Sequence, residues 1–379
     1  MASIRRGAGA AALALAVLVT VPACGPDGDG TRASGLPRSW DELKHWRFED
    51  WDRWASRHVF RNPEAGGVWD PDTMGGAPAQ QPSPASAAPP SAPPGGPTTA
   101  AATTAPTGTA TASAGPAASP VPAVVEAVPV PRPYTQYAAS GKVFMTAPAG
   151  GTGQCSATLV ADPAHPGRSN LVWTAAHCVH EGKDGDWFKN IIFVPAYNSS
   201  GAASGGRKAT LPEVAPLGQW WADRVITSPQ WTAEGGHSGN SANQYDFAVL
   251  KVHNPDGSGK SLEEVVGTAV PVWFDAPREK LSVSAWGYPV GRPFDGQELD
   301  RCDAGPPGQL SFDPARPAML TIGCTMTSGA SGGGWFATGP DGRQALVSNT
   351  SIGTLDHTSL NGPYLESVAR QALDYLSRK

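Results

Sequence analysis

An uncharged stretch of low complexity divides this chain and limits where it can build a core. From Gly76 to Pro120 no residue is charged, and nearly every position is Ala, Pro, Thr, Ser or Gly, so no helical or strand period can be assigned. The prolines favour extended conformations, and we expect residues 76–133 to form a disordered, semi-rigid linker. Because 45 glycines and 38 prolines are spread over 379 residues, one uniform globule is excluded. Structured parts are expected at 36–75 and at 134–379.

The first residues have the pattern of an export signal. Arg5 and Arg6 precede an uncharged run from Gly7 to Pro26 that is rich in Ala, Leu and Val, as in a secretory signal peptide. The sequence around Cys24 resembles a bacterial lipoprotein cleavage box. We expect residues 1–23 to be removed and Cys24 to be lipidated, which would hold the protein at the outer face of the cell membrane. Release without a lipid and an uncleaved membrane anchor remain open.

Residues 36–75 are rich in tryptophan. Ser39 and Glu42 form a capping-box pattern, which predicts that a helix begins there and continues to about Arg57. Three interpretations are open: a helix lying on lipid or cell wall, a prosegment covering an active site, or a helix docked on the main domain. Acidic and basic residues are nearly balanced, which weakens the membrane interpretation. The apolar residues of the helical stripe are Trp40, Leu43, Trp46, Trp51 and Trp54.

The remaining four cysteines indicate disulfides. Four cysteines in an exported protein predict two bridges and allow three pairings. None has the C-x-x-C spacing of a zinc site, and we expect no metal. These cysteines are Cys155, Cys178, Cys302 and Cys324.

Residues 134–379 have the pattern of an all-β protein. Short apolar alternations such as 142–146 and 247–252 are bounded by Gly, Pro, Asn and Asp, and the segment is long enough for a pair of β-barrels. Near the C-terminus, apolar residues between Leu365 and Leu376 follow helical spacing and predict an amphipathic helix. The net charge is -5 and no Lys/Arg block occurs, so nucleic acid is not expected as a partner.

Three short motifs in this segment carry functional information. They are the His177 motif (174–178), the Asp246 motif (246–250) and the Ser331 motif (329–333). Each alone is weak, because a histidine beside a cysteine is usually structural, an aspartate that opens a strand is usually a cap, and G-x-S-G-G can be only a loop. Together, in this order, they resemble the chymotrypsin-like (trypsin-like) serine peptidases, and more closely the bacterial branch that includes the glutamyl endopeptidases. The resemblance covers about 138–375.

The resemblance implies a fold and a mechanism. The fold would be two six-stranded antiparallel β-barrels followed by the C-terminal α-helix. Ser331 would attack a peptide carbonyl, His177 would accept its proton, and Asp246 would orient the imidazole. The backbone N–H groups of Gly329 and Ser331 would bind the oxyanion. The partner would be a polypeptide substrate, no cofactor would be needed, and we expect a monomer.

Two disulfide pairs and several binding residues also follow from the resemblance. Cys155 would pair with Cys178 beside the catalytic histidine, which leaves Cys302 with Cys324. Ser348 and Asn349 would lie on the edge strand that binds the substrate backbone. Trypsin-type enzymes have Asp at the position of Thr325, so a preference for Lys or Arg is not expected. Glutamyl endopeptidases have His at the position of Val347; His357 could approach from a loop, and the side-chain preference stays open.

Activation is expected to differ from that of the animal enzymes. Ala330 stands where those enzymes have the Asp that pairs with a newly formed N-terminus. The enzyme would therefore be active once folded, or inhibited by residues 36–75. We expect trimming the chain to begin near Tyr134 or Tyr137 to change activity much less than Ser331→Ala does.

Two other functions are compatible with the same sequence. A non-catalytic surface protein can use a peptidase fold for binding, since a fold does not fix a function. An esterase-like hydrolase could use the same three residues. Labelling of Ser331 separates the first from an enzyme, and comparison of ester with peptide hydrolysis separates the second.

Overall fold

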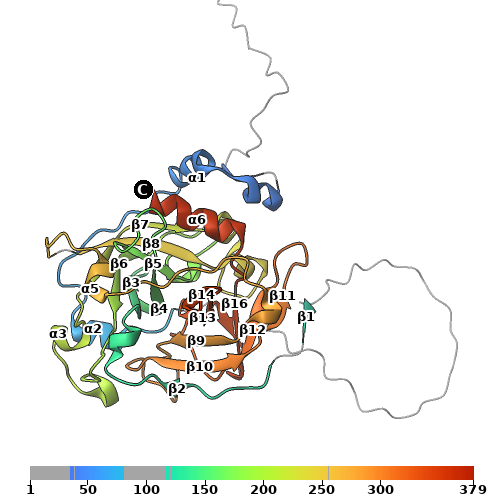
Figure 1. Ribbon diagram of the computed structural model, residues 1–379. Helices are drawn as coiled ribbons and strands as arrows, with labels where there is room; N and C mark the ends of the chain where they lie inside the picture. Colours follow the sequence, from blue (N-terminus) through green and yellow to red (C-terminus); the bar gives the residue numbers. More distant parts are fainter. Residues whose placement is uncertain (1–34, 38, 81–116, 120–121, 255) are drawn as a thin grey trace, which may run out of the picture.

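The computed structural model describes residues 35–37, 39–80, 117–119, 122–254 and 256–379. The expected signal peptide, Cys24 and the central part of the expected linker lie outside these residues. Figure 1 shows a body of β-strands with the C-terminal helix α6 (Ser367–Ser377) and helix α1 (Phe48–Ala55) together along one side. Within the described chain, no helix has both the length and the apolar character needed to span a bilayer.

The first half of the β body is a closed antiparallel barrel. Its six strands follow one another in the order β3-β4-β5-β8-β7-β6. Branched and aromatic side chains, such as Val143, Leu159 and Val249, are fully buried inside it, as expected for a small barrel filled by its own side chains. The strands are β3 (Ser140–Thr146), β4 (Thr152–Val160), β5 (Leu171–Thr174), β6 (Lys189–Pro195), β7 (Trp220–Thr227) and β8 (Ala248–His253).

The second half consists of two five-stranded antiparallel sheets. Their orders are β14-β13-β9-β10-β2 and β1-β11-β12-β16-β15. Ala285 from the first sheet and Ile322 from the second are both fully buried in one shared core. The all-β class is therefore confirmed, although these strands form two sheets rather than one closed six-stranded ladder. Their bounds are β9 (Val283–Gly287), β10 (Asp300–Gly305), β11 (Gly308–Ser311), β12 (Met319–Gly323), β13 (Gly334–Thr338), β14 (Gln344–Asn349), β15 (Ile352–Gly353) and β16 (Ser359–Gly362).

Part of the expected linker belongs to this second half. β1 (Ala117–Ala118) pairs with β11, and β2 (Val128–Pro129) pairs with β10. Next to β2, the N–H of Val130 donates to the carbonyl of Leu299 at 2.8 Å, and the Val130 side chain is buried. The buried Val130, together with Val125, which packs against the core of the second half, gives the end of this stretch apolar side chains to bury.

The C-terminal helix forms as the apolar spacing predicts. Helix α6 (Ser367–Ser377) packs on β7 and β8, with Val368, Ala372 and Leu376 buried. The other helices are short: α3 (Leu211–Val214), α4 (Pro229–Glu234), α5 (Leu262–Val266), and the 3-10 helices η2 (Tyr134–Tyr137), η3 (Ala176–Cys178), η4 (Ser204–Gly206), η5 (Ser241–Tyr245) and η6 (Arg278–Lys280).

The tryptophan-rich segment is docked on the β body. We call residues 39–80 the strap. Instead of one helix it forms η1 (Trp40–His45), α1 (Phe48–Ala55) and α2 (Pro71–Gly76). Ser39 makes no side-chain capping bond; Asp50 caps α1 by accepting the N–H of Arg47 at 3.0 Å. The prediction of a single helix is therefore wrong. The apolar stripe is divided because the chain turns to follow the surface of the β body.

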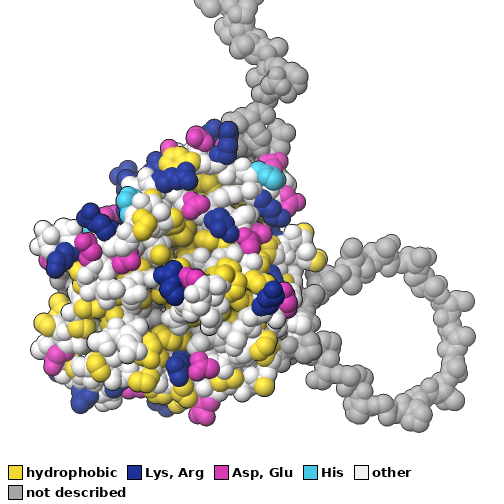
Figure 2. All heavy atoms as spheres, in the orientation of Figure 1, with side chains coloured by type: hydrophobic (Ala, Val, Ile, Leu, Met, Phe, Trp, Pro, Cys, Tyr) yellow, Lys and Arg dark blue, Asp and Glu magenta, His cyan; other side chains and the backbone are white. Residues whose placement is uncertain are grey.

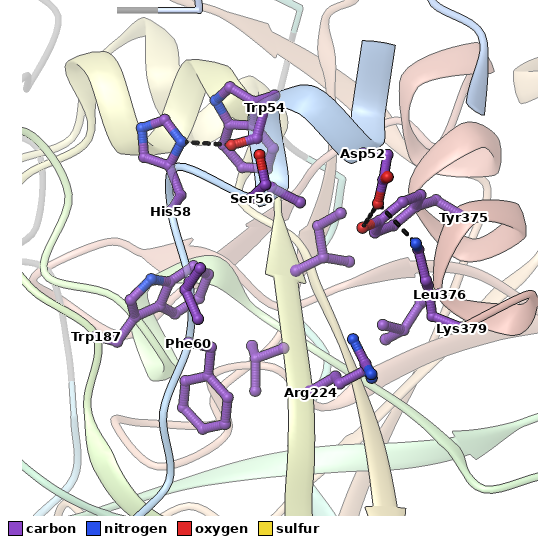
Figure 3. A pocket seen from close by; sticks show the side chains of 14 residues that line it. Asp52, Trp54, Ser56, His58, Phe60, Trp187, Arg224, Tyr375, Leu376 and Lys379 are labelled. Atoms are coloured by element: carbon purple, nitrogen blue, oxygen red, sulfur yellow. Dashed lines mark hydrogen bonds and ion pairs between the residues drawn. The ribbon is translucent and has the colours of Figure 1, made fainter. Parts of the chain in front are cut away.

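The strap is fixed to α6 by packing and by hydrogen bonds. Trp51 is buried and its Nε1 donates to Gln371 Oε1 at 3.0 Å, while Asp52 accepts the Tyr375 hydroxyl at 3.0 Å. A cavity of about 220 Å³ remains between α1, β7 and α6. Figure 3 shows its lining side chains, among them Arg224. This segment is thus docked on the main domain.

Beyond α1 the strap continues along the first barrel. The side chain of Asn62 bonds to both backbone groups of Ile191, donating to its O at 3.0 Å and accepting its N–H at 2.8 Å. Trp69 donates to the carbonyl of Asn190 at 2.6 Å. On the face shown in Figure 2, basic and acidic side chains are scattered among one another over the β body.

Candidate active site

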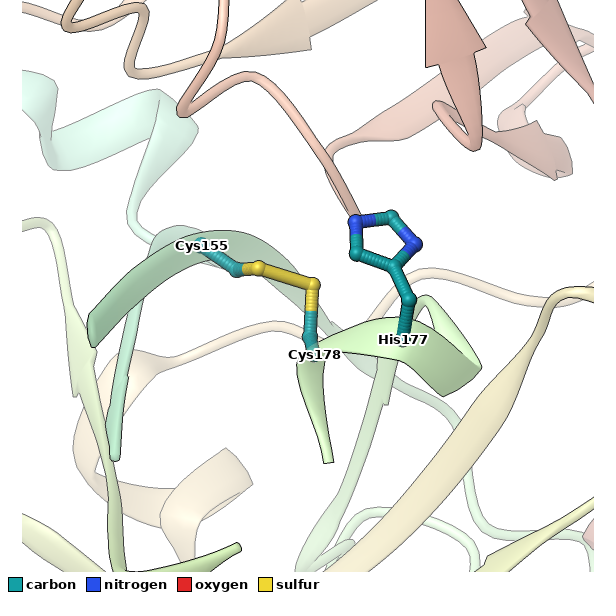
Figure 4. Close-up of side chains that lie close together, drawn as sticks. All are labelled: Cys155, His177 and Cys178. Atoms are coloured by element: carbon teal, nitrogen blue, oxygen red, sulfur yellow. A yellow bond between two sulfur atoms is a disulfide. The ribbon is translucent and has the colours of Figure 1, made fainter. Parts of the chain in front are cut away.

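The chain places His177 on a short 3-10 turn that follows β5. β5 is held between β4 and β8, so the turn η3 emerges from the closed barrel, and His177 is buried. The neighbouring residue Cys178 forms a disulfide with Cys155 of β4 at an S–S distance of 2.04 Å (Figure 4). The two sulfur atoms and the imidazole lie close together, but the sulfurs are bonded to each other and are not thiolate ligands.

Asp246 is fully buried and accepts three hydrogen bonds. Oδ1 accepts the backbone N–H of His177 at 2.9 Å, and Oδ2 accepts Nδ1–H of the same residue at 2.7 Å. The Ser351 hydroxyl donates to Oδ2 at 2.6 Å. Because the carboxylate can only accept, the proton of the neutral imidazole is on Nδ1 and the lone pair is on Nε2. Nε2 is buried and makes no hydrogen bond within the described residues.

Two further side chains fix the backbone of Asp246. Trp173 Nε1 donates to Asn349 Oδ1 at 2.9 Å, and Asn349 Nδ2 donates to the carbonyl of Asp246 at 3.0 Å. All three residues are fully buried. The carboxylate is therefore held from both its side chain and its main chain.

Ser331 lies on the loop between β12 and β13, and this loop is bonded to β4. The N–H of Ser156 donates to the carbonyl of Ser331 at 2.7 Å, and the Ser156 hydroxyl donates to the carbonyl of Gly329 at 2.8 Å. Gly332 has φ +76, and a Cβ there would collide with Thr174 Oγ1 and the carbonyl of Ser156. Only glycine allows this close approach.

These contacts bring the serine loop against the histidine loop. Thr174 is three residues before His177, and Gly332 is one residue after Ser331. The N–H of Gly332 donates to the carbonyl of Thr350 at 2.8 Å, next to the Ser351 that bonds Asp246. No hydrogen bond joins the Ser331 hydroxyl to His177 Nε2. In enzymes without substrate such bonds are often long and shorten only in the reactive complex.

The backbone around Ser331 also offers hydrogen-bond donors. Gly329 has φ +96, and its loop is fixed by the N–H of Val290, which donates to the carbonyl of Ser328 at 2.6 Å. Across the part of the chain that the structure describes, the N–H groups of Gly329 and Ser331 donate no hydrogen bond. Such unpaired N–H groups can stabilise a negatively charged oxygen.

A small pocket of about 20 Å³ adjoins Ser331. Most of the side chains that line this pocket carry a hydroxyl group. His357, on the loop after β15, also lines it. Thr325, a predicted binding residue, does not line it, because its hydroxyl accepts the N–H of Ala127 at 2.9 Å. Besides Ser331, the lining residues are Met326, Thr327, Ser328, Thr350, Ser351, Gly353, Thr354, His357 and Leu360.

Ser348 and Asn349 lie, as predicted, on an edge strand of a sheet, which is β14. Both are fully buried in β14; Ser348 donates to the carbonyl of Pro363 at 2.7 Å, and Asn349 supports Asp246. The serine that contacts Asp246 and the pocket is Ser351, and Gly353 lies on the adjacent β15. The repeated Ser/Thr pattern around 348–351 did not distinguish the two serines.

The disulfides have the pairing that the resemblance implies. Besides Cys155–Cys178, the structure contains Cys302–Cys324, which joins β10 to the end of β12. Cys324 is two residues before Met326, so this bridge supports the wall of the pocket. No sequence pattern indicated that the strap reaches β4 beside the other disulfide, where the carbonyl of Gln80 lies 3.8 Å from Cys155 Sγ.

Comparison with solved structures finds serine proteases. A thermostable serine protease, AL20, from an extremophilic microorganism is 32% identical with a TM-score of 0.51, and the match covers 65% of this chain and 99% of that one. The protease Anisep from Arthrobacter nicotinovorans is 29% identical (TM-score 0.49; 69% and 99% covered), and a Glu endopeptidase in complex with MPD is 16% identical (TM-score 0.47; 68% and 99% covered). No family model and no curated protein matches the chain.

Proposed function

The chain belongs to the chymotrypsin-like serine peptidases, and we propose that it is an exported endopeptidase that uses Ser331, His177 and Asp246. The observation that carries this proposal is the state of His177. Its Nδ1–H is bonded to a fully buried carboxylate at 2.7 Å, and its Nε2 has no partner among the described residues. A buried imidazole with one nitrogen fixed and the other free is suited to accept a proton from a neighbouring hydroxyl.

In the proposed first step, Ser331 Oγ attacks the carbonyl carbon of the scissile peptide bond. A C–O bond forms, the hydroxyl proton passes to Nε2 of His177, and the carbonyl electron pair becomes an oxyanion. The N–H groups of Gly329 and Ser331 are the donors for that oxyanion. His177 then gives its proton to the leaving amine as the C–N bond breaks. A water molecule repeats the sequence on the acyl-enzyme and releases the acid.

Asp246 contributes by orientation and charge. Its bond to Nδ1–H holds the imidazole in the tautomer that leaves Nε2 free, and its negative charge favours the imidazolium that forms during each step. The Ser351 hydroxyl and the His177 N–H occupy further lone pairs of the carboxylate. The carboxylate therefore keeps one orientation without being exposed to water.

A fluorophosphonate probe tests the proposal on the full chain. The probe should form a bond to Ser331, located by peptide mapping, and Ser331→Ala should abolish labelling. Ser200→Ala removes an exposed hydroxyl on the first barrel and serves as the matched control, which should label like the wild type. A folded wild-type chain that stays unlabelled would favour the non-catalytic binding protein instead.

Peptide and ester substrates separate the remaining alternative. An endopeptidase should cleave internal amide bonds of a peptide library, whereas an esterase-like hydrolase should cleave only the matching esters. The serine protease neighbour at 32% identity supports the peptidase and a polypeptide substrate. We expect the same preparation to be monomeric in size-exclusion chromatography.

Export and lipidation are part of the proposal. Residues 1–24 have the pattern of a lipoprotein signal, and the two disulfides are of a kind that persists in oxidising compartments. Growth with a clickable fatty acid should label the wild type but not Cys24→Ala. A wild type without label would leave secretion without a lipid as the localisation.

A further inference from the structure

The end of the strap pairs with β4 through an isolated parallel β-bridge. The N–H of Gln80 donates to the carbonyl of Gln154 at 2.9 Å, and the N–H of Gln154 donates to the carbonyl of Pro78 at 2.9 Å. Ala79 stands opposite Gln154 in this parallel bridge. The side chain of Gln154 also donates to the carbonyl of Ala77. Strap residues 77–80 thus occupy both backbone groups and the side chain of Gln154.

This pairing lies beside the proposed catalytic residues. Gln154 directly precedes Cys155, whose disulfide partner adjoins His177. Ser156, two residues after Gln154, holds the carbonyl groups of Ser331 and Gly329. The strap end and the nucleophile loop are therefore attached to the same few residues of β4.

The pocket lies on a different side of Ser331. It is formed by the loop before Ser331 and by Thr350 to Leu360, and no residue of β4 lines it. When the acyl part of a substrate binds in this pocket, its leaving-group part extends past Ser331 and His177 toward β4 and the disulfide. Peptides bind such edges by pairing with backbone N–H and C=O groups, and at Gln154 these groups are already paired with the strap.

We propose that strap residues 77–80 occupy the leaving-group side of the substrate cleft and determine which substrates are cleaved. This inference rests on the proposed peptidase function. Amides with a small leaving group react in the resting chain, whereas a peptide that continues beyond the scissile bond must first displace this strand. The strap end is thus a specificity-determining segment as well as a barrier to long substrates.

The strap end is tethered, which makes it an effective competitor. Its first residue, Ala77, is buried, as is the preceding Met74, and Gln219 Nε2 donates to the carbonyl of Trp69 at 2.6 Å. A strand held on a short tether competes with a substrate at a high effective concentration. Each hydrogen bond it makes changes the competition by roughly five-fold to ten-fold, since a net hydrogen bond contributes about 1 kcal/mol.

Proline substitution tests the inference with a matched control. Gln80→Pro removes the N–H that donates to the carbonyl of Gln154. Ala79→Pro is the control, because the N–H of Ala79 makes no hydrogen bond within the described residues. In a parallel bridge this N–H points away from β4. The assay compares two substrates that have the same tetrapeptide on the acyl side of the scissile bond. This tetrapeptide is chosen beforehand by screening a library of coumarin amides. In the first substrate the leaving group is the coumarin, and in the second the peptide continues for three more residues and ends in a quencher.

The measured quantity is the ratio of kcat/KM for the extended substrate to that for the coumarin amide. Gln80→Pro should raise this ratio about five-fold to ten-fold, because one strap hydrogen bond is lost, and Ala79→Pro should leave it within about two-fold of the wild type. Gln154→Ala, which removes the side-chain bond to Ala77, should raise the ratio independently if Gln80→Pro fails to fold.

An unchanged ratio in the folded Gln80→Pro or Gln154→Ala chain, with the coumarin amide still cleaved, would overturn the inference and leave the peptidase proposal intact. A rise of equal size in Ala79→Pro would also overturn it, because the effect would then not come from the bond to β4. Failure of every chain to cleave the coumarin amide or to react with the fluorophosphonate would instead refute the proposed function.

Discussion

Replacement of the buried Lys142 by methionine should stabilise the protein at neutral pH and remove a pH dependence of its stability. Lys142 is on β3 and is 1% exposed. Its Nζ donates to the carbonyl of Gly296 at 2.9 Å and lies 4.5 Å from the centre of the Tyr197 ring. Burial lowers the pKa of this lysine from 10.5 to about 7, against a smaller opposing effect of the Asp295 charge.

The direction in which stability changes with pH follows from proton binding in the folded and unfolded states. Between pH 7 and 10.5 the unfolded chain keeps the proton on Lys142 and the folded chain does not. The unfolded state therefore binds more protons, and the free energy of unfolding rises with pH across this window. A pKa difference of about 3.5, at about 1.4 kcal/mol for each unit, corresponds to a penalty of about 5 kcal/mol below pH 7. This penalty disappears above pH 10.5.

Lys142→Met removes the penalty and also the bond to the carbonyl of Gly296, which costs about 1 to 2 kcal/mol. The variant should be more stable by about 2 to 3 kcal/mol at pH 7.5, where about 4 kcal/mol of the penalty applies, and nearly equal to the parent at pH 9.5. Guanidinium unfolding followed by tryptophan fluorescence measures both values. The experiment uses a Ser331→Ala background to prevent autolysis.

The control is Lys189→Met, which replaces an exposed lysine on the neighbouring β6. It should follow the parent at both pH values. A stability difference between Lys142→Met and the parent that does not change between pH 7.5 and 9.5 would refute the assignment, because the lysine would then have the same pKa in the folded and unfolded chains.

Three further substitutions probe the site and the strap. Asp246→Asn should lower kcat on a coumarin amide about 10³-fold to 10⁴-fold, because an amide at this position favours the tautomer with the proton on Nε2; full activity would contradict the role of the carboxylate. Gly332→Ala should lower stability by about 1 to 3 kcal/mol in thermal unfolding, because its Cβ collides with Thr174 Oγ1, and an unchanged melting temperature would contradict that packing. Asn62→Ala should lose two hydrogen bonds to Ile191 and speed proteolysis within the strap several-fold, a rate that must exceed that of the wild type if the strap is fixed there.

The sequence predicted those parts of the site that short motifs encode. His177, Asp246 and Ser331 each stand in a recognisable local pattern, and the apolar spacing that predicts helix α6 is likewise contained in consecutive residues. The disulfide pairs followed from the family resemblance. In each case the information lies within a few neighbouring positions, or in the order of those positions along the chain.

The sequence did not determine contacts that depend on strand register. Ser348 and Ser351 have similar neighbours, and only the folded structure shows that Ser351 is the one that reaches Asp246. The pairing of β13 with β14, just before Ser351, contains an irregularity between Trp335 and Phe336, which shifts the register in a way that no alternation pattern reveals. A shift by an odd number of residues moves a side chain to the other face of a sheet, so a buried position and a pocket position are easily exchanged.

The contacts of the strap determine how the activity of a chain without its N-terminal region is interpreted. The sequence led us to expect that trimming the chain to begin near Tyr134 or Tyr137 changes activity much less than Ser331→Ala does. In the structure, Trp51, Trp54 and Trp69 are buried against the β body, so such a chain loses their packing as well as the strand at Gln154. Burial of a large side chain contributes about 1.5 to 3 kcal/mol, and loss of several would destabilise the barrel that positions His177. Truncation therefore opens the substrate cleft and also lowers the stability of the fold. Gln80→Pro changes only the pairing with Gln154, so it separates the effect of the open cleft from the effect of lower stability.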